Sequence, residues 1–160
     1  MVNDSVSCPA LDFCMAVVDY RRNSYAYTYD GTSWSRGEYI TDVGLDSVSC
    51  PTSSFCMAVG TGGYANTYDG SRWSPGVIVN QIGLDSVSCP TLSFCMAVGS
   101  GSNGNGYAYT YDGARWSKGK DIAQTLLTGV SCPTPSFCAA VSAQSGNNQS
   151  GIAVVGSRSG

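Results

Sequence analysis

The side chains with the most reactive chemistry in this sequence are eight cysteines, which come in pairs. Thiols could form disulfides, bind a metal ion or carry out redox exchange. Zinc sites usually hold cysteines closer in sequence or combine them with histidine, and redox pairs have the Cys-x-x-Cys pattern. The chain has no histidine and no Cys-x-x-Cys. We therefore predict no metal site and four structural disulfides between cysteines six positions apart: Cys8–Cys14, Cys50–Cys56, Cys89–Cys95 and Cys132–Cys138.

The remaining ionisable residues do not form a recognisable catalytic set. Without histidine, the common general base and the Ser-His-Asp triad are missing. Glu38 is the single glutamate, and no motif places a second carboxylate beside it for glycoside hydrolysis. Most of the ten aspartates recur at fixed repeat positions, which is typical of an architectural role. The sequence predicts a protein that is not an enzyme and needs no cofactor.

Aromatic and amide side chains are the best candidates for binding a ligand. Sugars stack their C–H faces on aromatic rings and form hydrogen bonds to polar groups, and the chain has ten tyrosines and three tryptophans among many Asn and Gly residues. One weak site in each repeat would raise avidity. We therefore predict a lectin-like protein that binds a glycan or another cell-surface ligand. The candidate residues are Tyr25, Tyr27, Tyr64, Tyr107, Tyr109, Asn23, Asn66 and Asn105.

Two other functions fit the same sequence. The segments Tyr20–Ser24, Thr61–Gly63 and Ser100–Gly106 vary between repeats, and variable loops on a constant frame are typical of a protein-interaction scaffold. Such a scaffold would be a module of a larger extracellular assembly. The near-identity of the repeats also fits an engineered propeller fragment.

A repeat of about 42 residues must position all these side chains. Asp-Ser-Val-Ser-Cys-Pro occurs three times, and a weaker copy begins at Gly129; the first cysteines of the repeats lie at 8, 50, 89 and 132. The pattern predicts one repeat domain over 1–160, with repeats 4–45, 46–84, 85–127 and 128–160, the last incomplete.

Each repeat is predicted to contain four short strands. Asp-Ser-Val-Ser-Cys and Phe-Cys-Met-Ala-Val-Gly flank a Pro-Thr turn, and an alternating Tyr-rich strand follows a variable loop. A tight Asp-Gly turn then leads to a fourth strand that begins at tryptophan. The turn residues are Asp30, Gly31 and Trp34; Asp69, Gly70 and Trp73; and Asp112, Gly113 and Trp116. In the fourth repeat 151–156 can serve as the third strand.

Four strands per 40 to 45 residues is the period of a β-propeller blade. The fold class is therefore all-β, a propeller of four-stranded antiparallel blades, with about four blades per chain. A β-trefoil is the alternative, although it needs three repeats and this chain enters a fourth. Because the fourth blade is incomplete, either four blades close alone with a missing outer strand, or two chains pair into a propeller ring of about eight blades. Of the two we expect the homo-oligomer, since half-propellers expose blade faces that must be buried.

The pattern Val-Ser-Cys…Cys-Met-Ala-Val-Gly…Tyr-Asp-Gly-x-x-Trp resembles secreted actinobacterial β-propeller repeats. It is more distantly similar to the Asp-box repeats of sialidases and photosystem-assembly propellers. The resemblance implies that Thr28, Asp30, Gly31 and Trp34 close the turn between the third and fourth strands of a blade, although Asp and Gly are adjacent here and separated in the usual box. Some propellers of this type are lectin-like parts of surface assemblies.

Composition restricts the partners and the compartment. With a net charge of −3 and no basic run, nucleic acid is not an expected partner. The sequence also lacks an apolar stretch of about 20 residues, so membrane insertion is not expected. An even number of regularly spaced cysteines is typical of proteins of oxidising compartments, which predicts secretion.

Overall fold

The computed structural model describes residues 4–142 and 153–157, and in this part every regular element is a β-strand. The first repeat contains β1 (Asp4–Ala10), β2 (Phe13–Tyr20), β3 (Asn23–Tyr29) and β4 (Glu38–Thr41). The second contains β5 (Leu45–Thr52), β6 (Phe55–Gly60), β7 (Tyr64–Tyr68) and β8 (Val77–Ile78). The third contains β9 (Ser86–Thr91), β10 (Phe94–Ser100), β11 (Gly106–Tyr111) and β12 (Lys120–Ala123). The fourth contains β13 (Leu127–Thr134), β14 (Phe137–Ser142) and β15 (Ala153–Ser157).

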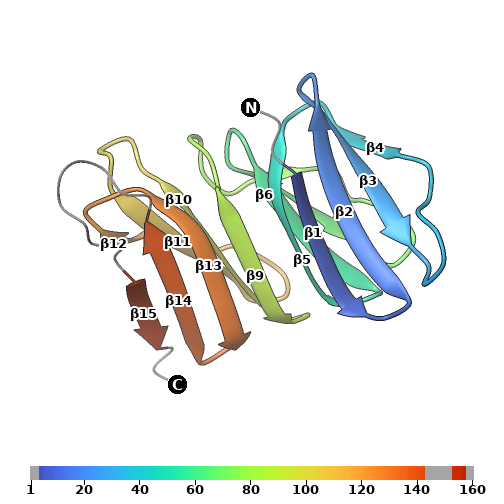
Figure 1. Cartoon of the computed structure of the whole chain (residues 1–160). Helices are drawn as coiled ribbons and strands as arrows, with labels where there is room; N and C mark the ends of the chain where they lie inside the picture. The colour runs from blue at the N-terminus through green and yellow to red at the C-terminus, as the bar shows by residue number, and fades with distance from the viewer. Residues whose placement is uncertain (1–3, 143–152, 158–160) are drawn as a thin grey trace.

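Each repeat folds into its own antiparallel sheet with the strands in chain order. The sheets follow one another like propeller blades, and their first strands β1, β5, β9 and β13 form a row (Figure 1). The prediction of an all-β, blade-like fold is confirmed. The β-trefoil alternative is wrong, because among the described strands each sheet draws on a single repeat.

The fourth blade has three described strands. β15 pairs with β14, where the sequence predicted a third strand over 151–156; residues 151 and 152 of that prediction lie outside the described residues. Within the described ranges, no helix has the length and apolar character that crossing a membrane requires.

The first hairpin of each blade carries its disulfide. All four predicted pairs are bonded, and each joins Cα atoms 4.1 Å apart. The first strand continues through the Cys-Pro pair, so the turn is shorter than the predicted Pro-Thr-x-x and comprises only its last two positions, Leu11 and Asp12 in the first blade. A register shift between Ser7 and Ala10 allows the proline to remain in the strand.

The apolar cores lie between blades. We call the side of a blade that faces the preceding repeat its front face and the other side its back face. Between the first two blades, the back-face residues Met15 and Val17 meet the front-face residues Val48 and Ala58. Met57 and Val59 meet Val87 and Ala97 in the same way one blade later. Strand alternation thus gives each blade two apolar faces, and the faces that meet between successive blades bury each other.

Serine side chains join the first strands of successive blades. The amides of Val48 and Cys50 donate hydrogen bonds to the hydroxyl oxygens of Ser5 and Ser7, at 3.1 and 2.9 Å. The same contacts recur at the next two junctions: Val87 to Ser47, Cys89 to Ser49, Val130 to Ser86, and Cys132 to Ser88. The repeated Ser-Val-Ser therefore satisfies the free amides of the first strand of the next blade, which we call the innermost strand of that blade.

Two local predictions were wrong. Tyr20 and Asn23 belong to paired strands, and the first variable segment is a two-residue turn at Arg21 and Arg22, whose φ angles of 55° and 70° are those of a tight hairpin turn. The fourth strand does not begin at tryptophan. Trp34 forms one isolated bridge with Tyr29, and regular pairing starts at Glu38.

Candidate functional site

The Asp-Gly turns are held by their own aspartate. Asp30 Oδ1 accepts hydrogen bonds from the amides of Thr32 and Ser33 at 2.9 and 2.8 Å and from the Thr32 hydroxyl at 2.7 Å. Asp69 and Asp112 hold the equivalent turns through the amides two and three residues further on. Gly31 has a φ of 93°, a conformation in which glycine is unstrained. These side chains bind their own turn and shape the blade.

These contacts favour the carboxylate form of the aspartates. The amide of Ser33, then the hydroxyl and amide of Thr32, lower the pKa of Asp30 to about 2. The amides of Arg72 and Ser71 lower the pKa of Asp69 to about 2, and those of Arg115 and Ala114 lower the pKa of Asp112. None of the three groups is buried, so hydrogen bonding is the cause.

Acid is therefore expected to weaken the fold through these turns. A pKa that is lower in the folded chain stabilises it above the unfolded pKa of about 4, and this stabilisation is lost as pH falls toward 2. The midpoint of thermal unfolding should fall between pH 4 and pH 2, and less steeply in Asp69→Asn, which keeps an acceptor but does not titrate. An equal slope for both proteins would contradict the role of Asp69.

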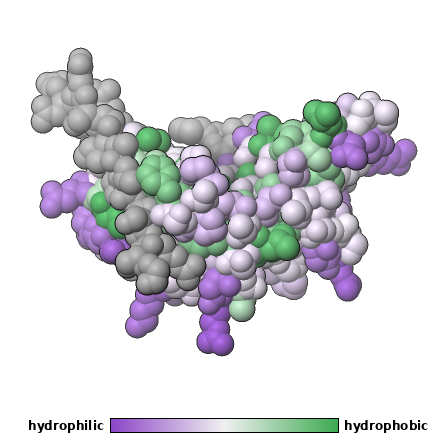
Figure 2. Space-filling model, turned by 90° about the horizontal axis from the view of Figure 1, so that it is seen from below, coloured by the Kyte–Doolittle hydropathy of each residue, from purple (hydrophilic) through white to green (hydrophobic). Residues whose placement is uncertain are grey.

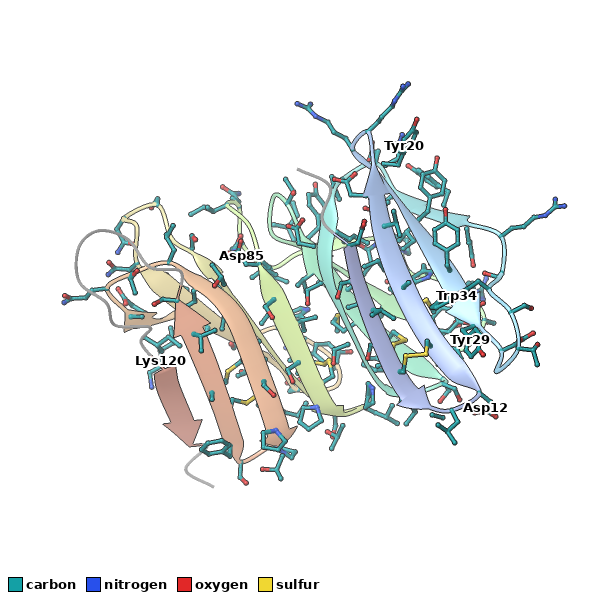
Figure 3. All side chains as sticks on the ribbon, in the orientation of Figure 1. Asp12, Tyr20, Tyr29, Trp34, Asp85 and Lys120 are labelled. Atoms are coloured by element: carbon teal, nitrogen blue, oxygen red, sulfur yellow. A yellow bond between two sulfur atoms is a disulfide. The ribbon has the colours of Figure 1, made fainter. Side chains whose placement is uncertain are left out.

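Each Asp-Gly turn places a tryptophan against the last tyrosine of the third strand. The ring centroids of Tyr29 and Trp34 lie 5.4 Å apart, and the pairs Tyr68–Trp73 and Tyr111–Trp116 are each separated by 5.5 Å. Trp34 is exposed at the free end of the array (Figure 3), whereas Trp73 and Trp116 are half-buried against the preceding blade.

The predicted tyrosine stripe lies on the front faces. Tyr25 and Tyr27 pair with Val18 and Ala16, so all four residues share the front face of the first blade. In the third blade the same face is covered, and Tyr109 is buried in the core between blades. Tyr64 and Tyr107 are half-buried. In the third blade the stripe therefore packs between blades, whereas Tyr25 and Tyr27 of the first blade lie on a face that no blade of the described chain covers.

The three predicted asparagines have different surroundings. Asn66 is buried and donates a hydrogen bond to the Ser74 carbonyl, and its Oδ1 has no hydrogen-bond partner among the described residues. Asn105 donates to Asp121 Oδ2 at 2.6 Å, and Asn23 is a half-buried residue at the start of β3. The sequence predicted one weak site in each repeat; the eight residues are spread over three blades, and burial removes Asn66 and Tyr109 from contact with a ligand.

Two clefts between blades are the best candidates for a site. The first, of about 400 Å³, lies between the second and third blades and exposes Tyr111 and Trp116 beside Thr67, Ser74 and Arg115. The second, of about 330 Å³, lies between the third and fourth blades, where Met96 and Ile122 form apolar walls near Lys118 and Lys120. Lys120 lies at β12, along the outer side of its blade (Figure 3).

The two clefts use equivalent positions of their repeats. Met57, Thr67 and Ser74 of the first correspond to Met96, Thr110 and Ser117 of the second. They differ because the Asp-Gly-x-x-Trp motif of the third blade supplies Trp116 to the first cleft, and the fourth repeat has no such motif. In the view of Figure 2, apolar residues form small separate patches among polar ones.

Sequence reasoning missed most of the residues that line these clefts. The repeat pattern predicts a turn role for Trp116, and it gives no ligand signal for Arg115, Thr67 or Ser74. Their equivalent spacing in each repeat was visible, but only the fold places one blade's hydroxyls beside the next blade's aromatic pair. In the part of the chain that the structure describes, no three Cys, Asp or Glu residues are grouped to hold a metal ion.

The chain is similar in structure to solved proteins, and one family model matches a short part of it. A family model described as "Protein of unknown function (DUF3678)" matches residues 39–58, a short segment from β4 into β6. No curated protein matches the chain. The computationally designed Ika4 protein is similar over 98% of this chain and 91% of its own, with a TM-score of 0.64 and 8% identity. The WD40 β-propeller domain of Doa1 is similar over 86% of this chain and 60% of its own, with a TM-score of 0.48 and 11% identity.

Proposed function

We propose that the chain is a secreted, non-catalytic protein that binds carbohydrate in the clefts between its blades. The observation that carries the proposal is the Tyr111–Trp116 pair, which lines a cleft together with two hydroxyl side chains and Arg115. An aromatic face next to a few polar groups is the arrangement that a sugar ring requires, since it offers one apolar face and an edge of hydroxyls.

The polar groups of this cleft retain hydrogen-bonding capacity. Thr67 donates its amide and its hydroxyl to the Ser74 oxygen, at 2.9 Å each, which fixes both side chains. The Ser74 hydroxyl hydrogen and the Thr67 lone pairs remain available to a ligand. The Arg115 guanidinium is exposed at the same opening and can donate to sugar hydroxyls or to an acidic sugar.

Four disulfides are consistent with an extracellular site of action, because reducing compartments rarely maintain such bonds. We also propose that the Asp-Gly turn is related to an Asp-box and that the repeats are related to those of secreted actinobacterial propellers. A protein-interaction scaffold is the competing function. It would use the exposed aromatics of the first blade, Tyr20, Trp34 and Tyr39.

A glycan array tests the proposal. We expect the chain to bind defined glycans, and Trp116→Ala to weaken binding at least about tenfold, because loss of an aromatic anchor typically exceeds 1.4 kcal/mol. Trp116→Phe should keep most of the affinity, since it preserves an aromatic face.

The matched control is Tyr20→Ala, which removes an exposed aromatic side chain at the β2–β3 turn, outside both clefts. It should bind like the unmodified chain. No binding across the array, together with capture of a defined protein through the first blade, would replace carbohydrate binding by the scaffold function. Equal losses of glycan affinity in Trp116→Ala and Tyr20→Ala would contradict binding in the cleft.

A further inference from the structure

In the described part of the chain, no blade covers the front face of the first blade. Val48 and Val87, at equivalent positions of the second and third blades, are each 5% exposed, whereas Val6 is 59% exposed. Cys8 is exposed as well, although Cys50 and Cys89 are buried. A shallow apolar depression on this face is lined by Val6, Ala16 and Val18. The sequence here is that of an inter-blade core, but the surface is open.

On the back face of the fourth blade, residues that are buried between blades elsewhere are exposed. Val141 is 48% exposed, while Val17, Val59 and Val98 at the same repeat position are fully buried. Phe137 is exposed, and its counterpart Phe94 is buried. Inside the chain, Val17 and Val48 belong to one core cluster, and Val59 and Val87 belong to the next. Val141 and Val6 are therefore the two halves of a contact that the chain makes repeatedly.

The serine positions at the two ends of the row of blades differ from those at the internal junctions. At the internal junctions, the Ser-Val-Ser of one blade accepts hydrogen bonds from the next blade's strand. Ser131 occupies the second serine position of the fourth blade and is exposed, and Gly129 replaces the first serine. At the other end, the structure gives the Val6 and Cys8 amides no side-chain partner among the described residues, whereas Val48 and Cys50 have one.

We propose that the back face of the fourth blade binds the front face of the first blade in a second copy of this chain. Ser131 would accept a hydrogen bond from the Cys8 amide, and Val141 would bury Val6, as Ser7 and Val17 do for Cys50 and Val48. Each chain carries both faces, so the contact is head-to-tail, and in the proposed dimer two such junctions close the two chains into one ring.

The partner is a second copy rather than the chain's own other end. β1 and β13 lie at opposite ends of the row, and β5 and β9 separate them (Figure 1). The contact continues an interface that the chain already forms three times, so no new recognition chemistry is needed. The end faces lie outside the cleft between the second and third blades, so dimerisation and carbohydrate binding there can be tested separately.

Charge complementation tests this head-to-tail contact. In sedimentation of the full chain we expect a mass of twice 16.6 kDa for the unmodified protein. Val6→Asp and Val141→Lys should each sediment at 16.6 kDa, because each places a charge in both junctions of its own dimer. An equimolar mixture should regain the double mass, since one junction then pairs Asp with Lys and the other is unmodified.

Val77→Lys is the matched control, because Val77 is similarly exposed but lies on β8, away from both end faces. It should keep the double mass. Circular dichroism of each variant serves as the folding control. We expect the β-sheet signal of the unmodified chain, because the substituted positions are exposed. A single-chain mass for the unmodified protein at all concentrations would overturn the proposal. So would a dimer that only Val6→Asp disrupts, since it would join two front faces.

Discussion

Reduction of the four disulfides is expected to unfold the chain at room temperature. Each bond closes a loop of six residues, which stabilises the folded state by about 2 kcal/mol in the chain-entropy model. The sum approaches the whole free energy of unfolding of an ordinary domain, about 5 to 15 kcal/mol. Far-ultraviolet circular dichroism with and without a reductant should show loss of the β-sheet signal.

The stability lost on removing a single disulfide should depend on how deeply that disulfide is buried. Replacing Cys89 and Cys95 by alanine removes a bond from a core between blades, whereas replacing Cys8 and Cys14 removes one whose first cysteine is exposed. Both loops have the same length, so the Cys89–Cys95 variant should lose more stability by its packing contribution alone. A reduced chain with an unchanged unfolding midpoint would contradict the structural role of these bonds.

Truncation of a leucine between two blades should have the next largest effect. Leu84 is buried in the core shared by the second and third blades. Leu84→Ala should lower the free energy of unfolding by about 3 kcal/mol, because it removes apolar contacts and leaves a cavity that the strands cannot fill. Denaturant titration measures the loss.

The control for this prediction is Leu92→Ala, the same substitution at an exposed turn of the third blade. It should change the free energy by less than about 0.5 kcal/mol. Similar costs for both variants would mean that the core does not lie between the blades.

The blade itself could be predicted because its signals are local. Each cysteine pair lies in one hairpin, and each Asp-Gly turn is stabilised by amides two and three residues along the chain. Such contacts recur with the repeat and can be recognised within about 40 residues.

Contacts between blades could not be predicted in the same way. The alternation of Tyr25 and Tyr27 shows that they share a face, but not whether that face meets solvent or another blade. The role of Ser5 and Ser7 was also hidden, because their partners lie 43 positions further on. The variable segment at Arg21 and Arg22 contains no glycine, so a turn with positive φ was not expected.

The cleft between the second and third blades could not be predicted either, because it depends on contacts between blades. The cleft takes Thr67 and Ser74 from one blade and Tyr111 and Trp116 from the next. Within a single repeat, each of these residues has an adequate structural explanation. Only the contact between blades shows that hydroxyl groups and an aromatic pair share an opening.

Hydrogen exchange at the innermost strands tests most directly the central claim, that successive blades are joined through serine side chains and shared cores. In the full-length Val141→Lys chain, the amides of Cys50, Cys89 and Cys132 should exchange slowly, because each donates to a serine of the preceding blade. The equivalent amide of Cys8 should exchange quickly in this variant. Fast exchange at all four positions would contradict the account, because it would mean that neighbouring blades do not hold one another.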